Sequence, residues 1–360
     1  MDVFCCNTKV ISGAGAISAL EKFKADRVFL VADPYFMKDG TAKRALDASK
    51  AQCSEVFGNI QPDPTVELAA EGTIKLKEFK PDLIIALGGG SAIDCAKAMK
   101  FFAEERCSFA AIPTTSGSGS EVTDFAVLTY GDTKYPLVDP LLKPDMAILD
   151  SHLLEKLPKT LIADSGFDVL SHALEAYVAA DGGMMTDSLA KEAFVTAFNL
   201  LFDSYEGDVS VRLKVHEASC AAGMAFTHAG LGVCHALAHA LGGMFHIPHG
   251  RLNAVLLPAV VSANSAFAGA KYAKLAKAAG LGGGAETILV RNLKNALVRL
   301  RRQLQLPDTL TQAGADAGIL KSRREEIIQT AMKDPCCKTN PAPVTESLVM
   351  QILDEVTGRG

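Results

Sequence analysis

The sequence predicts two domains of different architecture: an α/β domain with a parallel sheet over residues 1–157, and an all-helical domain over residues 158–360. Three observations predict this fold class. A chain of 360 residues exceeds the usual size of one hydrophobic core. Short apolar runs alternate with helix-like segments in the first part of the chain. Beyond Pro158, apolar residues recur at helical spacing alone.

Four short apolar runs indicate buried strands in the first domain. They cover residues 27–32, 83–87, 110–112 and 147–149, and the first three end at Asp33, Gly88 and Pro113. Helix-like segments lie between them at residues 16–23, 66–79 and 92–102. Because continuous apolar strands that alternate with helices pair in parallel, we expect a sheet with helices on both faces.

Helical spacing dominates the second half of the chain. The clearest helices cover residues 161–177, 187–201, 211–224 and 231–242, with Thr186 and Asp187 as the start of the second. Residues 264–303 and 307–357 continue as helix, with breaks at residues 280–284, at Pro307 and at residues 341–343. We find no convincing strand pattern there, so the domain boundary falls near Pro158.

Composition excludes several classes of protein. Hydrophobic residues make up 49% of the chain and charged residues 21%, as in a globular enzyme. The net charge of −5 and the lack of a basic stripe argue against nucleic acid as a partner. Nine cysteines without a C-x-x-C pair favour a reduced, cytoplasmic environment. No signal peptide and no apolar stretch of roughly 20 residues is present, so we expect no membrane association.

A glycine-rich turn follows the second predicted strand. Gly88, Gly89, Gly90 and Ser91 lead into a helix, and Asp94 falls in its first turn. Backbone N–H groups at such a helix start can hold a pyrophosphate, and glycine lets the ligand approach closely. The turn differs from the usual G-x-G-x-x-G pattern, and a simple tight strand-to-helix turn is the alternative interpretation.

Two further features support dinucleotide binding. Residues 114–121 contain five hydroxyl side chains and two glycines directly after a strand, which suits a polar ligand cradle; a solvated Ser/Gly loop is the alternative. Asp33, at the end of an early strand, suits a ribose hydroxyl and would repel the 2′-phosphate of NADP. The alternative interpretation of Asp33 is a simple turn residue before Pro34.

Histidines and one aspartate indicate a metal site in the helical domain. Six of the eight histidines lie between His216 and His249. Asp168 and His172 are four residues apart and share a helix face, as do His235 and His239. Imidazole and carboxylate suit Fe(II) or Zn(II). Spacing alone predicts His235 and His239 together as ligands, and it leaves the complete ligand set open. Each of these histidines considered singly is better explained as a hydrogen-bonded core residue.

These motifs resemble the iron-containing (group III) alcohol dehydrogenases over essentially the whole chain. The most specific segments are residues 88–94, 113–122, 166–177, 223–232 and 248–250. Within that family, the chain looks most like the 1-propanol dehydrogenases of propanediol-degrading bacterial microcompartments. The segments that carry this closer likeness are residues 62–65, 134–137, 144–150, 245–250 and 339–341.

The resemblance implies a fold and a set of site residues. The fold is a Rossmann-like dinucleotide-binding domain and an all-α metal domain, with the active site in the cleft between them. The implied metal ligands are Asp168, His172, His235 and His249, whereas His239 would lie beside the metal and relay a proton. Gly88, Gly89, Gly90, Ser91 and Asp94 would hold the pyrophosphate. Further cofactor contacts would come from Asp33, Thr114, Thr115, Ser118 and Lys134.

The implied activity is the interconversion of short-chain aldehydes and primary alcohols with NAD(H), with propanal and 1-propanol as the model pair. Lactaldehyde, acetaldehyde or sulfoacetaldehyde are alternative substrates, and Zn(II) is an alternative to Fe(II). A metal-dependent hydrolase or lyase and a non-catalytic metal-stabilised partner protein are competing interpretations. We also expect a homodimer in the cytoplasm, with a bacterial microcompartment and its enzymes as the analogous setting.

Overall fold

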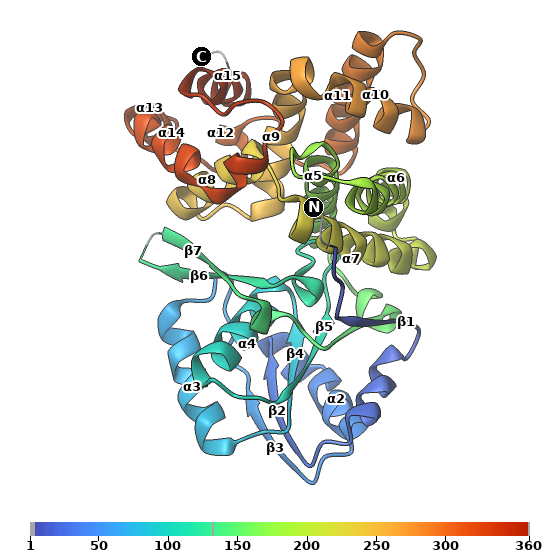
Figure 1. Ribbon diagram of the computed structural model, residues 1–360, viewed down its shortest axis with the longest axis vertical. Helices are drawn as coiled ribbons and strands as arrows, with labels where there is room; N and C mark the ends of the chain where they lie inside the picture. Colours follow the sequence, from blue (N-terminus) through green and yellow to red (C-terminus); the bar gives the residue numbers. More distant parts are fainter. Residues whose placement is uncertain (1–3, 132, 359–360) are drawn as a thin grey trace. The chain divides into compact units, whose positions relative to one another are not determined.

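The computed structural model describes residues 4–131 and 133–358, which form two compact units. One unit contains residues 5–157, and the other contains Phe4 together with residues from Pro158 onward. Figure 1 shows strands concentrated in the first unit and helices in the second. Among the described residues no single helix is long and apolar enough to cross a membrane. Two pairs of helices are long and apolar enough together, but each pair is sharply bent at its junction. They are Val209–Ala229 with Val233–Phe245, and His249–Ala263 with Ser265–Ala278, and only their length and composition resemble a membrane span.

The first unit is built on a six-stranded parallel sheet with the order β1-β8-β5-β4-β2-β3. Its strands are β1 Lys9–Gly13, β2 Arg27–Ala32, β3 Cys53–Phe57, β4 Leu83–Gly88, β5 Ser108–Pro113 and β8 Met146–Asp150. A separate antiparallel ribbon pairs β6 Phe125–Tyr130 with β7 Thr133–Val138. The helices of this unit are η1 Ala16–Phe23, α1 Pro34–Lys38, α2 Thr41–Ser49, α3 Val66–Phe79, α4 Gly90–Ala103, η2 Ser120–Val122, η3 Pro140–Leu142 and η4 Ser151–Leu154.

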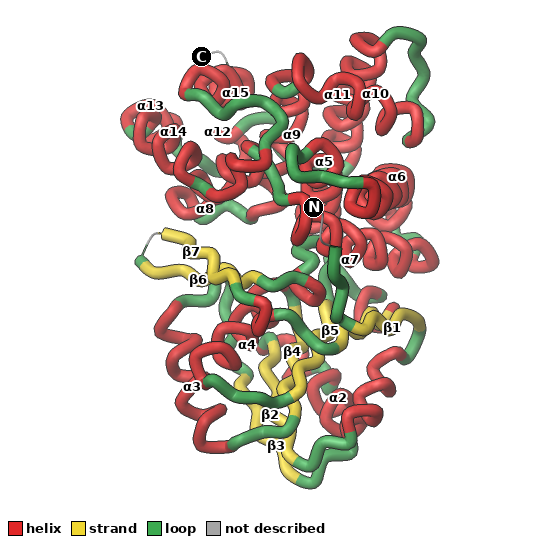
Figure 2. The backbone as a smooth tube through the Cα atoms, viewed as in Figure 1, coloured by secondary structure: helices red, strands yellow, loops and turns green. Residues whose placement is uncertain are grey.

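Apolar side chains alternate between the two faces of this sheet. On β2, Val28 and Leu30 join the core beneath η1 and α2, whereas Phe29 and Val31 join the core beneath α3 and α4. This alternation follows from the two-residue period of a strand. Both faces are therefore covered by helices (Figure 2), and the carboxyl ends of the parallel strands meet at one edge, where α/β proteins bind ligands.

The predicted parallel sheet is confirmed, but two of its strands were missed. All four predicted strands are present, each within two residues of the expected bounds. The missed strands β1 and β3 lie at the two edges of the sheet. Edge strands are half exposed and carry polar residues, such as Ser54 and Glu55 in β3, so they lack a continuous apolar run. The helix expected at residues 16–23 is of the 3-10 type, which short apolar spacing does not distinguish from an α-helix.

Every regular element in the described part of the second unit is a helix. These are α5 Lys159–Val178, α6 Met184–Glu206, η5 Val209–Val211, α7 Arg212–Ala229, α8 Val233–Phe245, α9 His249–Ala263, α10 Ser265–Ala278, α11 Glu286–Gln303, α12 Leu310–Ala313, α13 Ala317–Ser322, α14 Arg324–Lys333, η6 Pro335–Thr339 and α15 Glu346–Thr357. Helix α5 packs against α6, α7 and α9, and α8 packs against α9 and α14. The all-helical architecture predicted from sequence is confirmed.

Two local expectations for this unit were wrong. Helix α6 begins at Met184, and Thr186 lies inside its first turn, where its hydroxyl accepts a hydrogen bond from Gly183 N (2.8 Å). No helix was predicted over residues 249–263, but His249 is the first residue of α9, with Pro248 as the preceding cap residue. Pro248 and Gly250 flank His249 and are typical of a turn. Proline is also common next to a helix start, because its ring restricts the backbone angle φ.

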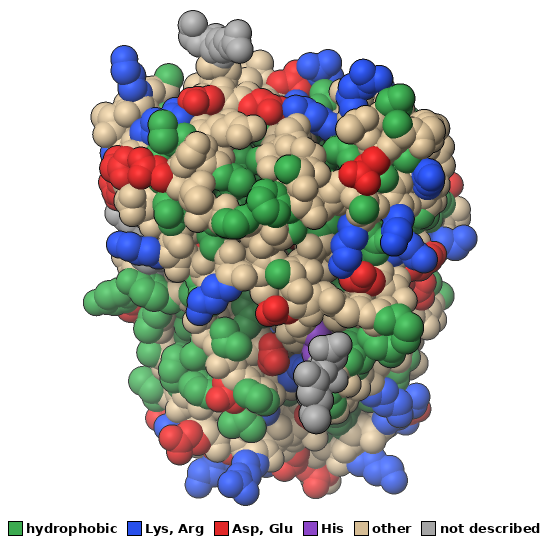
Figure 3. Space-filling model, turned by 45° about the horizontal axis from the view of Figure 1, so that its top comes forward, with side chains coloured by type: hydrophobic (Ala, Val, Ile, Leu, Met, Phe, Trp, Pro, Cys, Tyr) green, Lys and Arg blue, Asp and Glu red, His purple; other side chains and the backbone are tan. Residues whose placement is uncertain are grey.

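The surface mixes charges of both signs. On the face drawn in Figure 3, acidic and basic side chains lie close together rather than in separate fields. Several of the ion pairs are exposed, such as Lys50 with Glu21 and Lys159 with Glu206. Exposed pairs of this kind contribute little to stability, so the fold depends chiefly on its apolar cores.

Candidate functional site

Helix α5 supplies the first two members of a buried cluster. Asp168 and His172 are four residues apart and project from the same helix face, with Asp168 Oδ2 3.9 Å from His172 Nδ1. The ring of His172 stacks between Phe226 and His235, at centroid distances of 4.5 and 4.4 Å. This packing holds the imidazole in place before any ligand binds.

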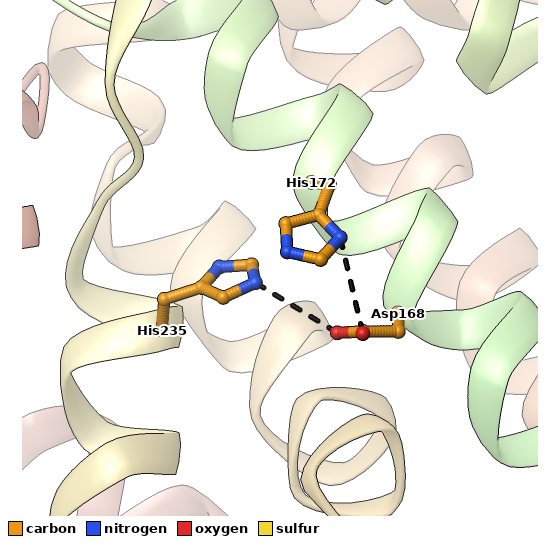
Figure 4. A group of neighbouring side chains, drawn as sticks. All are labelled: Asp168, His172 and His235. Atoms are coloured by element: carbon orange, nitrogen blue, oxygen red, sulfur yellow. Dashed lines mark ion pairs between the residues drawn. The ribbon is translucent and has the colours of Figure 1, made fainter. Parts of the chain in front are cut away.

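Helices α8 and α9 bring two more histidines to the same aspartate. His235 Nε2 lies 3.8 Å from Asp168 Oδ1, and His249 Nε2 lies 3.7 Å from the same oxygen. Figure 4 shows Asp168, His172 and His235 converging, although two helices supply them. Asp168, His172 and His235 are buried, whereas the His249 side chain is 27% exposed. The cluster therefore has a buried side and an open side at His249.

The donor set fits a divalent transition metal. The ligand atoms of Asp168, His172 and His235 all lie within 4.8 Å of one another. Donors bonded at about 2.1 Å to one tetrahedral ion lie roughly 3.4 Å apart, so small shifts would close these contacts around an ion. Three imidazoles and one carboxylate suit Fe(II) or Zn(II) and contain no thiolate.

Electrostatics hold Asp168 in its charged form. Burial raises the pKa of this carboxyl, but His172, His249 and His235 lower it more strongly, and the net shift is downward. Asn253, on α9 and fully buried, donates from Nδ2 to Asp168 Oδ1 (2.8 Å) and lies 3.3 Å from His235 Nε2. A negatively charged oxygen therefore faces the histidine nitrogens, as metal coordination requires.

Glu175 positions His235 from behind. Its Oε2 lies 2.6 Å from His235 Nδ1 and accepts from Gly232 N (3.0 Å), while Oε1 accepts from Cys234 N (2.8 Å). Burial lowers the pKa of His235, but Asp168 and Glu175 raise it to about 9. A carboxylate on Nδ1 leaves Nε2 directed at Asp168, which is the usual arrangement of a metal-binding histidine.

Sequence reasoning missed Glu175, although the sequence contains a signal for it. Asp168, His172 and Glu175 are spaced i, i+4 and i+7, so all three lie on one stripe of α5. Asn253 gave no comparable signal, because its role depends on how α9 packs against α5.

His239, one helical turn from His235, borders this cluster but pairs with a carboxylate other than Asp168. Its Nδ1 lies 2.8 Å from Asp334 Oδ2, and its ring stacks on that of His249 at 5.2 Å between centroids. Burial raises the pKa of Asp334, but the hydrogen bond from His239 lowers it to about 2. The structure therefore groups His249 with Asp168 and directs His239 to a different carboxylate.

The glycine-rich turn and Asp33 lie side by side at the carboxyl edge of the sheet. Gly88 is the last residue of β4, Gly89 precedes α4, and Gly90 and Ser91 form its first turn. Asp33 follows the neighbouring strand β2, and its Oδ2 accepts from Gly89 N (3.1 Å). A Cβ on Gly88 would overlap this carboxylate, so the position requires glycine. Burial raises the pKa of Asp33, against the effect of the Gly89 hydrogen bond.

The hydroxyl-rich loop lies against the same turn. Thr114 N donates to Gly88 O (3.0 Å). A Cβ on Gly89 would lie 3.3 Å from Thr115 Oγ1, and one on Gly90 would lie 3.0 Å from Ser118 Oγ. The structure thus brings together the two segments that were predicted to bind the cofactor, and hydroxyls surround an accessible helix start.

Asp94 has a different position from the one expected. It lies in the second turn of α4, not the first, and is buried. It accepts from Ser120 Oγ (2.8 Å) and from Val127 N (3.0 Å), so it anchors the hydroxyl loop and β6. The neighbouring Lys97, which sequence reasoning missed, is fully buried and donates to Thr123 O (2.9 Å). Both side chains stabilise the loop from within.

Lys134 lies on the β6–β7 ribbon. Its Nζ forms an ion pair of 2.6 Å with Asp63 Oδ1, and its side chain is 15% exposed. Its contact with a nicotinamide ribose stays a prediction.

Close packing of α5 and α9 predicts a strict requirement for glycine at position 250. A Cβ on Gly250 would overlap the backbone carbonyl of Asp164 and approach Asp168 Cβ. We therefore expect Gly250→Ala to push α9 away from α5, with a loss of about 1–3 kcal/mol in stability and weaker metal retention. Thermal unfolding and metal analysis after dialysis measure both effects. Gly282→Ala is the matched control, because a Cβ there meets no atom within 4 Å; equal behaviour of the two variants would contradict the prediction.

Comparison with known proteins shows the family of this chain. Residues 7–151 match the model of the iron-containing alcohol dehydrogenases, and residues 162–357 match that of the C-terminal domain of the Fe-containing alcohol dehydrogenase family. The NADPH-dependent butanol dehydrogenase of Clostridium saccharobutylicum is 39% identical, with 95% of this chain and 94% of that protein covered. The solved iron-containing alcohol dehydrogenase of Thermococcus thioreducens has a TM-score of 0.90 and 31% identity, covering 98% of this chain and 99% of its own.

The chain therefore belongs to the iron-containing alcohol dehydrogenase family and is an enzyme that acts on an alcohol or an aldehyde. Within the family it is similar to the 1-propanol dehydrogenase PduQ of Salmonella typhimurium, at 37% identity over 99% of this chain and all of that protein.

Proposed function

We propose that this enzyme interconverts short-chain aldehydes and primary alcohols with NAD(H), with propanal and 1-propanol as the best-fitting pair. The observation that carries the proposal is the convergence of three histidines on Asp168 in a member of this family. The likeness to a 1-propanol dehydrogenase and to a butanol dehydrogenase supports a small aliphatic substrate. A hydrolase would have no use for the glycine turn and hydroxyl loop at the sheet edge.

Each residue of the metal cluster has a proposed task. Asp168, His172, His235 and His249 would hold the ion, Fe(II) by family and Zn(II) as the alternative. When bound, the ion supplies Lewis-acid polarisation of the carbonyl oxygen. Glu175 keeps His235 Nε2 directed at the site, and the half-buried His239 exchanges the proton that the oxygen gains or loses.

The proposed cofactor site uses the sheet edge of the first unit. The start of α4, with Gly89, Gly90 and Ser91, would receive the pyrophosphate, and Thr114, Thr115 and Ser118 would line it. Asp94 would act indirectly, through the loop that it anchors. Asp33 would accept a hydrogen bond from the adenosine ribose, because its carboxylate lies beside Gly89 at the end of β2.

Cofactor preference should change when Asp33 loses its charge. We expect Asp33→Asn to raise the ratio of kcat/KM for NADPH to that for NADH by about tenfold, equivalent to about 1.4 kcal/mol, because a 2′-phosphate no longer meets a carboxylate. Asparagine keeps an acceptor for Gly89 N. Steady-state kinetics with both cofactors measure the ratio, and Asp208→Asn, an exposed helix cap in the other unit, is the control. An unchanged ratio would place the ribose elsewhere.

A substrate panel tests the overall proposal. Purified enzyme loaded with Fe(II) or with Zn(II) is assayed with NADH and propanal, acetaldehyde, lactaldehyde and sulfoacetaldehyde. We expect the highest kcat/KM with propanal and Fe(II); a strong preference for a charged aldehyde would overturn the substrate assignment. A homodimer in a bacterial microcompartment stays a prediction, for which light scattering and co-purification are the measurements.

A further inference from the structure

The corner between α14 and η6 presents a carboxylate to the candidate proton relay. Asp334 is the residue between these two helices, and Pro335 begins η6 directly after it. Its two oxygens have different partners. Oδ1 accepts from Cys336 N (2.8 Å), which caps η6, and Oδ2 lies 2.8 Å from His239 Nδ1 on α8. The two side chains meet although 95 residues separate them in sequence.

This contact determines which nitrogen of His239 carries hydrogen. An ionised carboxylate can only accept hydrogen bonds, so the nitrogen that faces it must be the donor. Nδ1 of His239 is therefore protonated, and Nε2 is the atom that can take up or release a proton. In hydrolases with a Ser-His-Asp arrangement, a buried aspartate fixes the histidine tautomer in the same way.

The ring plane of His239 is restrained as well. Its face stacks on the ring of His249, at 5.2 Å between centroids and 18° between planes, and its plane makes an angle of 65° with the ring of His235, at 6.3 Å between centroids. Asp334 holds the Nδ1 edge, so the Nε2 edge points away from the carboxylate. The side chain of His239 is 26% exposed, so it is partly accessible, whereas that of Asp334 is 15% exposed.

We propose that Asp334 is a positioning residue for the alcohol–aldehyde reaction, which holds His239 in the Nδ1–H tautomer and presents Nε2 to the substrate oxygen. This inference rests on the proton relay proposed above. In aldehyde reduction, bound NADH would supply the hydride for the new C–H bond as the C=O π bond breaks. The oxygen then takes a proton from Nε2 of the His239 imidazolium, which becomes the neutral Nδ1–H tautomer held by Asp334, and solvent returns a proton to Nε2; in alcohol oxidation the bare Nε2 takes up the proton that the hydroxyl loses. Asp334 touches neither substrate nor hydride and acts through the imidazole alone.

The alternative is that Asp334 merely caps η6, and asparagine separates the two roles. In Asp334→Asn, the amide oxygen can still accept from Cys336 N and keep the cap. The NH₂ group then faces His239 Nδ1 as a donor, so the histidine must move its proton to Nε2. A structural role survives this substitution, whereas a positioning role does not.

The first experiment measures kinetics on the Fe(II)-loaded enzyme with propanal and NADH. We expect Asp334→Asn to lower kcat by about 100-fold or more, which is the range for loss of a general acid–base group, with little change in the KM for propanal. Iron content and melting temperature should stay at the wild-type values. Asp316→Asn is the matched control, because Asp316 is an exposed aspartate that caps α13 by accepting from Ile319 N (2.8 Å). Equal kcat values for Asp334→Asn and wild type would overturn the proposal.

A double-mutant cycle tests whether Asp334 acts through His239. If it does, Asp334→Asn should have no further effect on kcat in a His239→Ala background. An equally large loss in that background would overturn the proposal, because it would show a route independent of the imidazole.

A spectroscopic readout separates failure of this inference from failure of the relay. In Zn(II)-loaded, ¹⁵N-histidine-labelled protein, NMR shifts report the tautomer of His239. We expect Nδ1–H in the wild type and Nε2–H in Asp334→Asn, with no change in Asp316→Asn. An unchanged tautomer would refute the positioning role alone, whereas full activity of His239→Ala would refute the relay on which it rests.

Discussion

Alanine at His235 should abolish both metal retention and activity, whereas alanine at His239 should keep the metal and lose only turnover. His235 Nε2 faces Asp168 at 3.8 Å, and its other nitrogen is held by Glu175. Its removal takes away a proposed direct ligand, so we expect a loss of metal affinity larger than the roughly 10–100-fold that a change in a supporting residue causes. His239 faces Asp334 instead, so its removal leaves the four proposed ligands in place.

The two variants control for each other. Both change the same residue type on the same helix, one turn apart, and both are analysed for iron or zinc after dialysis and for steady-state activity. His249→Ala should behave like His235→Ala, because its Nε2 lies 3.7 Å from the same Asp168 oxygen. An active, metal-free His235→Ala enzyme would refute the ligand assignment. Metal loss in His239→Ala would mean that His239 is itself a ligand, as its four-residue spacing from His235 on α8 suggests, even though its side chain faces Asp334 and not Asp168.

The second large effect is expected at Glu175. This carboxylate is 2% exposed and accepts hydrogen bonds from Gly232 N, Cys234 N and His235 Nδ1. In Glu175→Gln, the NH₂ group replaces one of two acceptor oxygens, so at least one buried N–H loses its partner at a cost of about 1–3 kcal/mol. His235 also loses the group that orients it. We expect a lower melting temperature without metal, and metal affinity reduced by about 10–100-fold.

Thermal unfolding with and without Fe(II) and a metal-competition titration measure these two effects separately. Glu192→Gln is the matched control, since Glu192 is exposed on α6 and its loss should change stability by less than about 0.5 kcal/mol. If Glu175→Gln lowered stability but left metal affinity at the wild-type value, Glu175 would be a helix cap for α8 and not a support for His235.

Much of the fold was predictable from local patterns. Central strands such as β2 and β4 are buried on both faces, so they appear as continuous apolar runs in the sequence. The helices of the second unit repeat apolar residues at helical spacing because one stripe of each faces a core. Edge strands β1 and β3 escaped detection because half of each is exposed and polar side chains are tolerated there. Helix α9 was missed because proline and glycine at its start resemble a turn.

The candidate site was predictable only in part. Asp168 and His172 share a helix, so their four-residue spacing was enough to place them together. The same rule paired His235 with His239, but the structure separates them: one faces Asp168 and the other faces Asp334. The family resemblance implied that His249, and not His239, is the remaining metal ligand. The structure places His249 beside Asp168. For Asp94, the sequence placed a carboxylate near the phosphate turn, whereas tertiary contacts direct it into the protein.

By itself, the sequence determined the two architectures, the segments that carry glycines and hydroxyls, and the histidines and aspartate that were predicted to form a metal site. Periodicity determines these features, since a helix or strand sets which of its own residues share a face. Tertiary structure alone decided which histidine nitrogen faces which carboxylate, because that depends on how α5, α8, α9 and the α14–η6 corner pack. Asp334 meets His239 across 95 residues, and no local spacing encodes such a contact.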